Sequence, residues 1–154
     1  MAGKAVALGE ALRPEFKAYA AAVLANARTL AARLQQQGFE LVGGGTDTPL
    51  MLVDLRSKGL TGAPAAQSLE RAGIIANMNP IPSDAEDLKV MSGLRFGVSG
   101  ATTRGFGVAE FEAIAALIGE LLEGLRASPT DNTRTEQAVL QRVRAITARF
   151  PLYG

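Results

Sequence analysis

The apolar residues between positions 14 and 38 recur at steps of three and four, which is the period of one face of an α-helix. Pro14 suits the first turn of this helix, and Gly38 can supply the left-handed conformation that ends it. The same spacing predicts a helix over about residues 108–126 and another over about residues 135–149. The first pattern consists of Phe16, Tyr19, Val23, Ala27, Leu30 and Leu34.

Shorter apolar runs between glycines predict the strands of a small sheet. Residues 39–42 and 74–77 fit short strands, and the unbroken apolar run at 50–54 is typical of a central strand covered on both faces. In residues 93–97 apolar side chains alternate with Arg95 between two glycines. Helices interleaved with three or four short strands predict an α/β domain, its helices packed on a small, mostly antiparallel or mixed sheet.

The segments between these elements carry turn and capping signals. Thr61 is expected to cap a helix that accepts Pro64 in its first turn and ends at Gly73. The stretch 78–92 contains two prolines and several charges, so we expect a long loop, and loops of this length usually carry a function. The triple glycine at 43–45 lacks the lysine of a phosphate-binding loop and is interpreted as a turn.

The opening run of residues 2–12 has a helix-forming composition, but no Ser, Thr, Asp or Asn precedes it to cap the first backbone N–H groups. Two interpretations follow. Either the start of this helix frays in solvent, or the preceding part of the element lies on a missing segment or on another chain.

The composition describes one ordinary globular domain over residues 1–154. Without His or Cys the chain has no Ser-His-Asp triad, thiolate nucleophile, imidazole base or ordinary zinc site, which argues against self-contained catalysis. The absence of cysteine fits a reducing, cytoplasmic compartment. A net charge of +1 without a basic block argues against nucleic acid as a partner. The longest uncharged stretch, 72–83, is too short to span a membrane.

Arg95 is the residue whose setting points most clearly to binding chemistry. In the expected strand, Leu94 and Phe96 point to the opposite face, while Gly93 and Gly97 leave room around the guanidinium. A buried arginine needs an anion, and its planar fork fits a carboxylate through two hydrogen bonds. That carboxylate belongs either to a ligand or to the fold itself.

Within the fold, the candidate salt-bridge partners of Arg95 are the acidic side chains of Asp47, Asp54 and Glu86. The amides of Asn77 and Asn79 could bind a ligand or simply form a turn. Arg104, just ahead of a helix, can pair with its neighbours.

Several short motifs follow one another along the chain in a distinctive order. They are Gly44-Gly45-Thr46-Asp47, the run 50–56, Gly59-Leu60-Thr61-Gly62, Ala72-Gly73-Ile74 with Asn77 and Asn79, Ser92-Gly93-Leu94-Arg95, Thr102-Thr103-Arg104-Gly105-Phe106, and Ala148-Arg149-Phe150-Pro151-Leu152-Tyr153. In this order and spacing they resemble the C-terminal domain of serine hydroxymethyltransferase, a pyridoxal-phosphate family of fold type I. The resemblance covers essentially the whole chain.

The resemblance implies that this chain corresponds to about the last third of such an enzyme, with the large domain missing. Residues 1–12 would be the remnant of the helix that links to the large domain, and residues 13–154 the small domain that binds the substrate carboxylate. Arg95 would bind the carboxylate of serine or glycine, and Asn79 would lie on the tetrahydrofolate side. Pyridoxal phosphate would be held by the missing large domain, because the family's cofactor-binding motifs do not occur here.

Three departures from the family pattern cluster near the expected site. Thr48-Pro49 stands where the family usually has Asn-His, Gly97-Val98-Ser99-Gly100 replaces Gly-Thr-Pro-Ala, and Lys89 occupies the place of a usual Phe. These changes leave open whether folate is used and which aldehyde is transferred.

The expected function is glycine hydroxymethyltransferase-like transfer of a hydroxymethyl group or another aldehyde, interconverting serine and glycine. It requires a partner, a pyridoxal-phosphate-binding large domain or subunit, within a homo- or hetero-oligomer, so the isolated chain is expected to be inactive. Two other hypotheses remain. The chain could be a non-catalytic module that pairs with a pyridoxal-phosphate-binding homologue, or an amino-acid sensor that uses Arg95.

Overall fold

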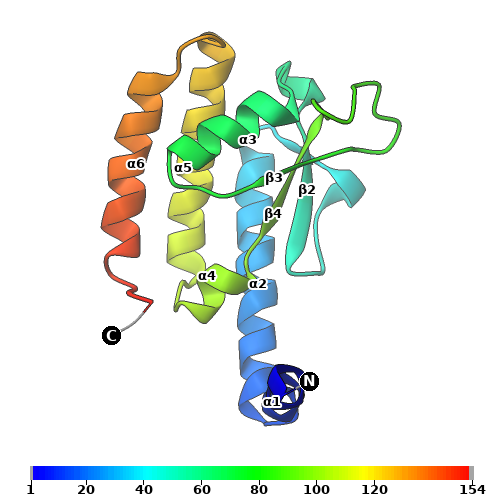
Figure 1. Ribbon diagram of the computed structural model, residues 1–154, viewed down its shortest axis with the longest axis vertical. Coiled ribbons are helices and arrows are strands. Elements are labelled where there is room, and N and C mark those ends of the chain that lie inside the picture. Colours follow the sequence, from blue (N-terminus) through cyan, green and yellow to red (C-terminus); the bar gives the residue numbers. More distant parts are fainter. Residues whose placement is uncertain (1, 153–154) are drawn as a thin grey trace.

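The computed structural model describes residues 2–152 and has two layers, in which the helices lie to one side of a four-stranded sheet (Figure 1). Tyr153, the last residue of the final motif, lies outside the described residues. The elements are α1 (Ala2–Ala11), α2 (Glu15–Gln36), β1 (Glu40–Leu41), β2 (Leu50–Asp54), α3 (Gly62–Arg71), β3 (Asn77–Asn79), β4 (Gly93–Gly97), α4 (Ser99–Thr103), α5 (Val108–Ala127) and α6 (Thr133–Thr147), with 3-10 turns at Val42–Gly44 and Arg56–Lys58.

The sheet has the strand order β1-β2-β4-β3, and every neighbouring pair is antiparallel. This confirms the predicted α/β fold and places β2 in the middle of the sheet, as expected. Arg95 of the inner strand β4 stands opposite Leu52 of β2 on one side and Asn77 of the edge strand β3 on the other.

Two of the predicted strands differ in their bounds from the observed ones, and the way the preceding helices end explains why neither begins where it was predicted. Gly38 donates its backbone N–H to Gln35, and Phe39 donates to Leu34, so the residues after α2 close that helix. At the end of α3, Gly73 donates its backbone N–H to Glu70 in the same way, and Ile74 donates to Leu69. Phe39 therefore does not join β1, and the strand predicted at 74–77 is observed as Asn77–Asn79.

The start of α3 is completed by the long loop and not by the expected threonine cap. Thr61 occupies the capping position, but its side chain makes no capping hydrogen bond. Instead, the backbone N–H of Gly62 donates to the carbonyl of Met91 at 2.8 Å, and that of Ala63 donates to Val90 at 3.0 Å. The loop between β3 and β4 is thereby docked on the first turn of α3.

The other helices agree with the sequence pattern to within a few residues. The last helix begins at Thr133 and ends at Thr147, two residues earlier at each end than predicted, and the short α4 was not predicted at all. The core lies between the sheet and the helices, and each fully buried apolar side chain contributes roughly 1.5–3 kcal/mol. Its largest members include Leu34, Leu55, Leu69, Leu94, Leu117, Ile118, Leu121 and Leu122.

Helix α1 and the first turns of α2 form an arm that projects beyond the rest of the protein (Figure 1). No residue of α1 is buried, and the side chains of Val6, Leu8 and Leu12 are more than half exposed, at 61%, 68% and 87%. The Tyr19 hydroxyl, farther along α2, lies 2.9 Å from the Thr103 hydroxyl of α4. Within residues 2–152, no helix combines the length and the apolar character that crossing a membrane requires.

Candidate functional site

The face of the sheet that points away from the helices is open. Strand β4 alternates as predicted, with Leu94 and Phe96 buried and Arg95 exposed. Residues directly opposite in an antiparallel sheet share a face, which places Leu52 and Asn77 beside Arg95. The expectation that β2 is covered on both faces is wrong for the described residues, because the Leu50 side chain on this face is 49% exposed and Leu52 is half-buried.

Arg95 has no carboxylate partner within residues 2–152. Its Nη2 donates to Asn77 Oδ1 at 3.4 Å, a long bond on the exposed surface. Of the three acidic partners considered from the sequence, Asp54 pairs with Arg56 at 2.7 Å, and neither Asp47 nor Glu86 pairs with Arg95. The guanidinium is exposed in this chain, so water solvates it, and the argument from a buried charge does not apply here.

The two glycines that flank Arg95 play different parts. A Cβ added to Gly93 would lie 2.7 Å from the Cγ2 of Ile81, 2.8 Å from the carbonyl oxygen of Asn79 and 3.1 Å from a methyl of Leu52. Gly93 is therefore needed for close packing between β4, β3 and the loop, and the expected free space beside it is filled. At Gly97 the nearest atom to such a Cβ is a methyl of Leu50, at 3.1 Å.

Asn79 lies at the end of β3, opposite Gly93, on the same face as Asn77 two residues earlier. It is half-buried, whereas Asn77 is exposed. The structure thus brings Asn79 and Arg95, the two predicted site residues, onto neighbouring strands of one open face. The interpretation of Asn77 and Asn79 as turn residues is wrong, because both belong to β3.

Sequence reasoning missed Asp84, which organises the loop between these two residues. Its carboxylate accepts the Ser92 hydroxyl at 2.6 Å and the backbone N–H groups of Ser92, Ile81 and Glu86 at 2.8, 3.2 and 3.1 Å. The bond from the Ser92 hydroxyl is the largest influence, and together with the backbone donors it lowers the pKa of Asp84 to about 2. Asp84 follows Pro82-Ser83, a turn signal that could have marked it.

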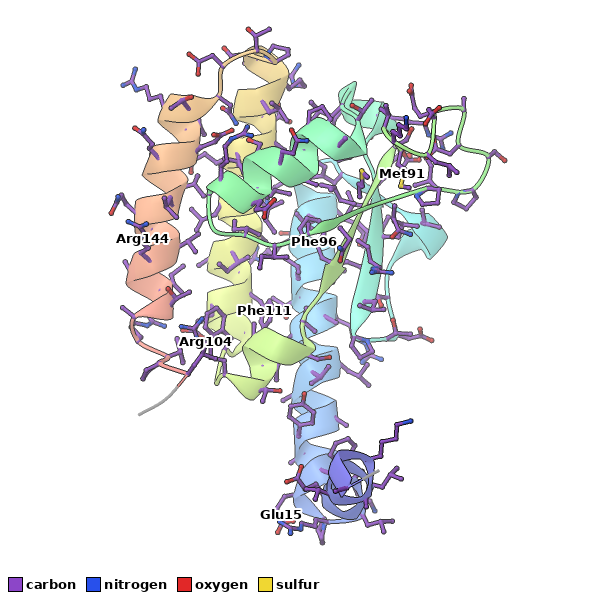
Figure 2. The ribbon with its side chains drawn as sticks, in the orientation of Figure 1. Glu15, Met91, Phe96, Arg104, Phe111 and Arg144 are labelled. Atoms are coloured by element: carbon purple, nitrogen blue, oxygen red, sulfur yellow. The ribbon has the colours of Figure 1, made fainter. Side chains whose placement is uncertain are left out.

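Arg104 has the structural role that the sequence left open. Its guanidinium donates to the carbonyls of Thr147, at 3.0 Å, and Phe150, which fastens the segment after α6 to the end of α4 (Figure 2). Beside it is an apolar cavity of about 490 Å³, whose walls include Phe96, Phe106 and Phe111. Because Phe96 belongs to the covered face of β4, this cavity is separate from the Arg95 face.

Each of the four lysines in the described residues is either exposed or already hydrogen-bonded. A lysine that forms a Schiff base is normally desolvated. The Nζ of Lys58 is committed to the carbonyl of Gln37 and to Glu123, both at 2.9 Å, and the other three lysines, Lys4, Lys17 and Lys89, are exposed. Nor do residues 2–152 contain a group of acidic side chains able to hold a metal ion.

Comparison with known proteins agrees with the motifs. A sequence model of the family described as serine hydroxymethyltransferase matches residues 1–118. The chain is 57% identical over its whole length to "Serine hydroxymethyltransferase 3" of Colwellia psychrerythraea, and 56% identical over 99% of its length to proteins of the same family name from Ralstonia nicotianae and Rhodospirillum centenum. It spans only 36% of the length of each of these relatives.

Proposed function

The chain belongs to the serine hydroxymethyltransferase family, and on this premise we propose that it is the small domain that binds the substrate carboxylate in such an enzyme. It corresponds to the C-terminal part of the family's proteins. The observation that carries the proposal is Arg95, a guanidinium with no acidic partner among the described residues, at the centre of an open sheet face.

The open face suits an amino-acid carboxylate. A guanidinium offers two parallel N–H groups to a planar anion. Arg95 makes only one long side-chain hydrogen bond, to Asn77, so its other N–H groups are available to a ligand. Leu50 and Leu52 flank it on β2, and a second polypeptide surface packed on these leucines would exclude water from the ion pair. Arg95 would then be desolvated, and its attraction to a carboxylate correspondingly stronger.

The remainder of the activity would come from outside this chain. In the proposed enzyme, pyridoxal phosphate supplies the carbon-bond chemistry, and the large domain or subunit holds it. This chain would bind and orient the serine or glycine through Arg95, and Asn79 would face the tetrahydrofolate side. We propose that residues 1–12 continue toward the large domain, and that the assembled enzyme is an oligomer. A cytoplasmic location stays a prediction.

The test joins this chain to the part of the Colwellia psychrerythraea relative that it does not cover, in one polypeptide. Arg95→Ala should raise the dissociation constant for glycine about 30-fold or more, since losing one partner of a desolvated pair costs roughly 2–5 kcal/mol. Arg144→Ala, an exposed arginine on α6, is the control and should bind as the parent does. An unchanged affinity in Arg95→Ala would refute the carboxylate role.

The isolated chain offers a second measurement. Incubated with pyridoxal phosphate and then borohydride, it should carry no stoichiometric adduct at any one lysine, because Lys58 is already hydrogen-bonded and the three exposed lysines react without preference for one site. A stoichiometric adduct would contradict the proposal that the large domain or subunit, and not this chain, holds pyridoxal phosphate. If the joined polypeptide folds but acquires no transferase activity, the alternative of a non-catalytic pairing module is favoured.

A further inference from the structure

The loop of residues 80–92 has no helix or strand, yet it leaves and rejoins the sheet at adjacent positions, because Asn79 and Gly93 are paired across β3 and β4. An irregular loop of this length loses much conformational entropy when it is ordered. Two of its residues, Ser83 and Met91, adopt a left-handed backbone with φ of 57° and 52°, which persists only where neighbouring bonds fix it. Something in the loop must therefore hold its conformation.

Asp84 does so by joining the two ends of the loop. Its Oδ2 accepts the backbone N–H of Ile81, near the start, and that of Ser92, at the end. Its Oδ1 accepts the Ser92 hydroxyl and the N–H of Glu86. Four donors on one carboxylate, drawn from both ends of a loop, form a clamp in which a charged acceptor strengthens each bond. We use the name Asp84 clamp for these contacts among Ile81, Asp84, Glu86 and Ser92.

The Asp84 clamp lies between the two site residues. Ile81 is two residues after Asn79, its side chain is buried, and its Cγ2 would lie 2.7 Å from a Cβ placed on Gly93. Ser92 is three residues before Arg95, and its carbonyl accepts the N–H of Leu55 at 2.9 Å. Any change in how the loop closes is therefore transmitted directly to β3 on one side and to β4 on the other.

We propose that Asp84 is a positioning residue, which sets the spacing of Asn79 and Arg95 and thereby the affinity of Arg95 for its ligand. The ligand class is an amino-acid carboxylate held at Arg95, so the inference rests on the proposed function. Asp84 itself touches no ligand. Its effect passes through the loop ends, the backbone of β3 and β4, and the Arg95–Asn77 contact.

The matched variants are Asp84→Asn and Asp87→Asn. Asparagine keeps the size of the side chain but removes the charge and points a donor amide at groups that are themselves donors. Asp87 lies in the same loop, is exposed, and accepts the N–H of Lys89 only two residues away, so it closes a local turn without joining the loop ends. Ser92→Ala removes one bond of the clamp and covers the case in which Asp84→Asn does not fold.

The first readout uses this chain alone and needs no ligand. In Asp84→Asn, nuclear magnetic resonance should show shifted signals for the Asn79 side-chain amide and the Arg95 Nε–H, and the Ser92 amide should exchange at least about tenfold faster. Ser92→Ala should shift the same signals in the same direction by less, and Asp87→Asn should leave them in place. Unmoved Asn79 and Arg95 signals in Asp84→Asn would overturn the proposal, as would equal shifts in Asp87→Asn.

The second readout uses the joined polypeptide described above. Asp84→Asn should raise the KM for serine roughly tenfold and change kcat less than about twofold, because misplaced binding groups weaken binding before chemistry. A general loss of folded protein would lower the amount of active enzyme without raising KM. An unchanged KM alongside a weakened Arg95→Ala variant refutes the Asp84 clamp. An Arg95→Ala variant that binds normally refutes the proposed function, and the resonance shifts then decide the clamp independently.

Discussion

The two faces of the four-stranded sheet differ in burial. On one face Met51, Val53, Leu94 and Phe96 are buried beneath the helices. On the other, the same strands present Arg95 and partly exposed leucines, with no helix over them in residues 2–152. Both sets of side chains come from the same short strands, so one face of the sheet forms the core of this chain while the other stays exposed in the described residues.

The largest expected effect comes from removing a side chain of the covered face. Phe96→Ala should lower the free energy of unfolding by about 3–5 kcal/mol, because it leaves a cavity in the core. Arg95→Ala, its neighbour on the open face, should change that free energy by less than about 0.5 kcal/mol. Urea unfolding at neutral pH measures both. An equal loss of unfolding free energy in the two variants would contradict the conclusion that only one face contributes to the core.

Acid should act on the loop that borders the open face. The folded pKa of Asp84, about 2, lies below its ordinary value of 3.8, so its contribution to stability is present above pH 4 and is lost as the pH falls toward 2. The stability difference between the parent and Asp84→Asn, from urea unfolding, should therefore shrink over this range. A difference that is the same at pH 6 and pH 2 would contradict the clamp. Carboxylates whose lowered pKa does not depend on Asp84, such as Glu136 beside Arg71, act equally in both proteins.

The smallest effect on folding is expected where apolar side chains are already exposed. Leu50→Ser on the open face and Leu8→Ser on the arm should each change the free energy of unfolding by no more than about 0.5 kcal/mol. Both should instead reduce self-association of the isolated chain, because exposed apolar patches favour contact between copies. Sedimentation velocity measures the change. A parent chain that stays monomeric at high concentration would show that Leu8 and Leu50 do not promote self-association.

Much of the fold could be predicted from periodicity, because the helices and the inner strands are long enough for their apolar positions to repeat. The alternation of Leu94, Arg95 and Phe96 was predicted for the same reason and placed Arg95 correctly. The strand predicted at 74–77 failed because hydrogen bonds that close α3 compete for the first of its backbone groups. Such competition depends on geometry that a hydrophobic pattern does not record.

The candidate site was predictable only in part. Asp84 was missed because its partners Ile81 and Ser92, three and eight residues away, follow no helical or strand period and are brought together only by the folded loop. The double coverage predicted for β2 failed in an instructive way. Leu50 and Leu52 are apolar, as a strand buried on both faces requires, yet this chain covers one face and spans 36% of its relatives' length. An apolar pattern indicates that a segment is suited to burial. It does not show that this chain itself buries the segment.

Helix α2 has a structural consequence. It runs without interruption from Glu15 to Gln36, a rod of about 33 Å at 1.5 Å per residue, with its outer turns in the arm and its inner turns in the core. Tyr19 ties it to Thr103 of α4, the helix that directly follows the Arg95 strand. Through α2 and this hydroxyl contact, the arm is joined to the helix at the far end of the strand that carries the guanidinium.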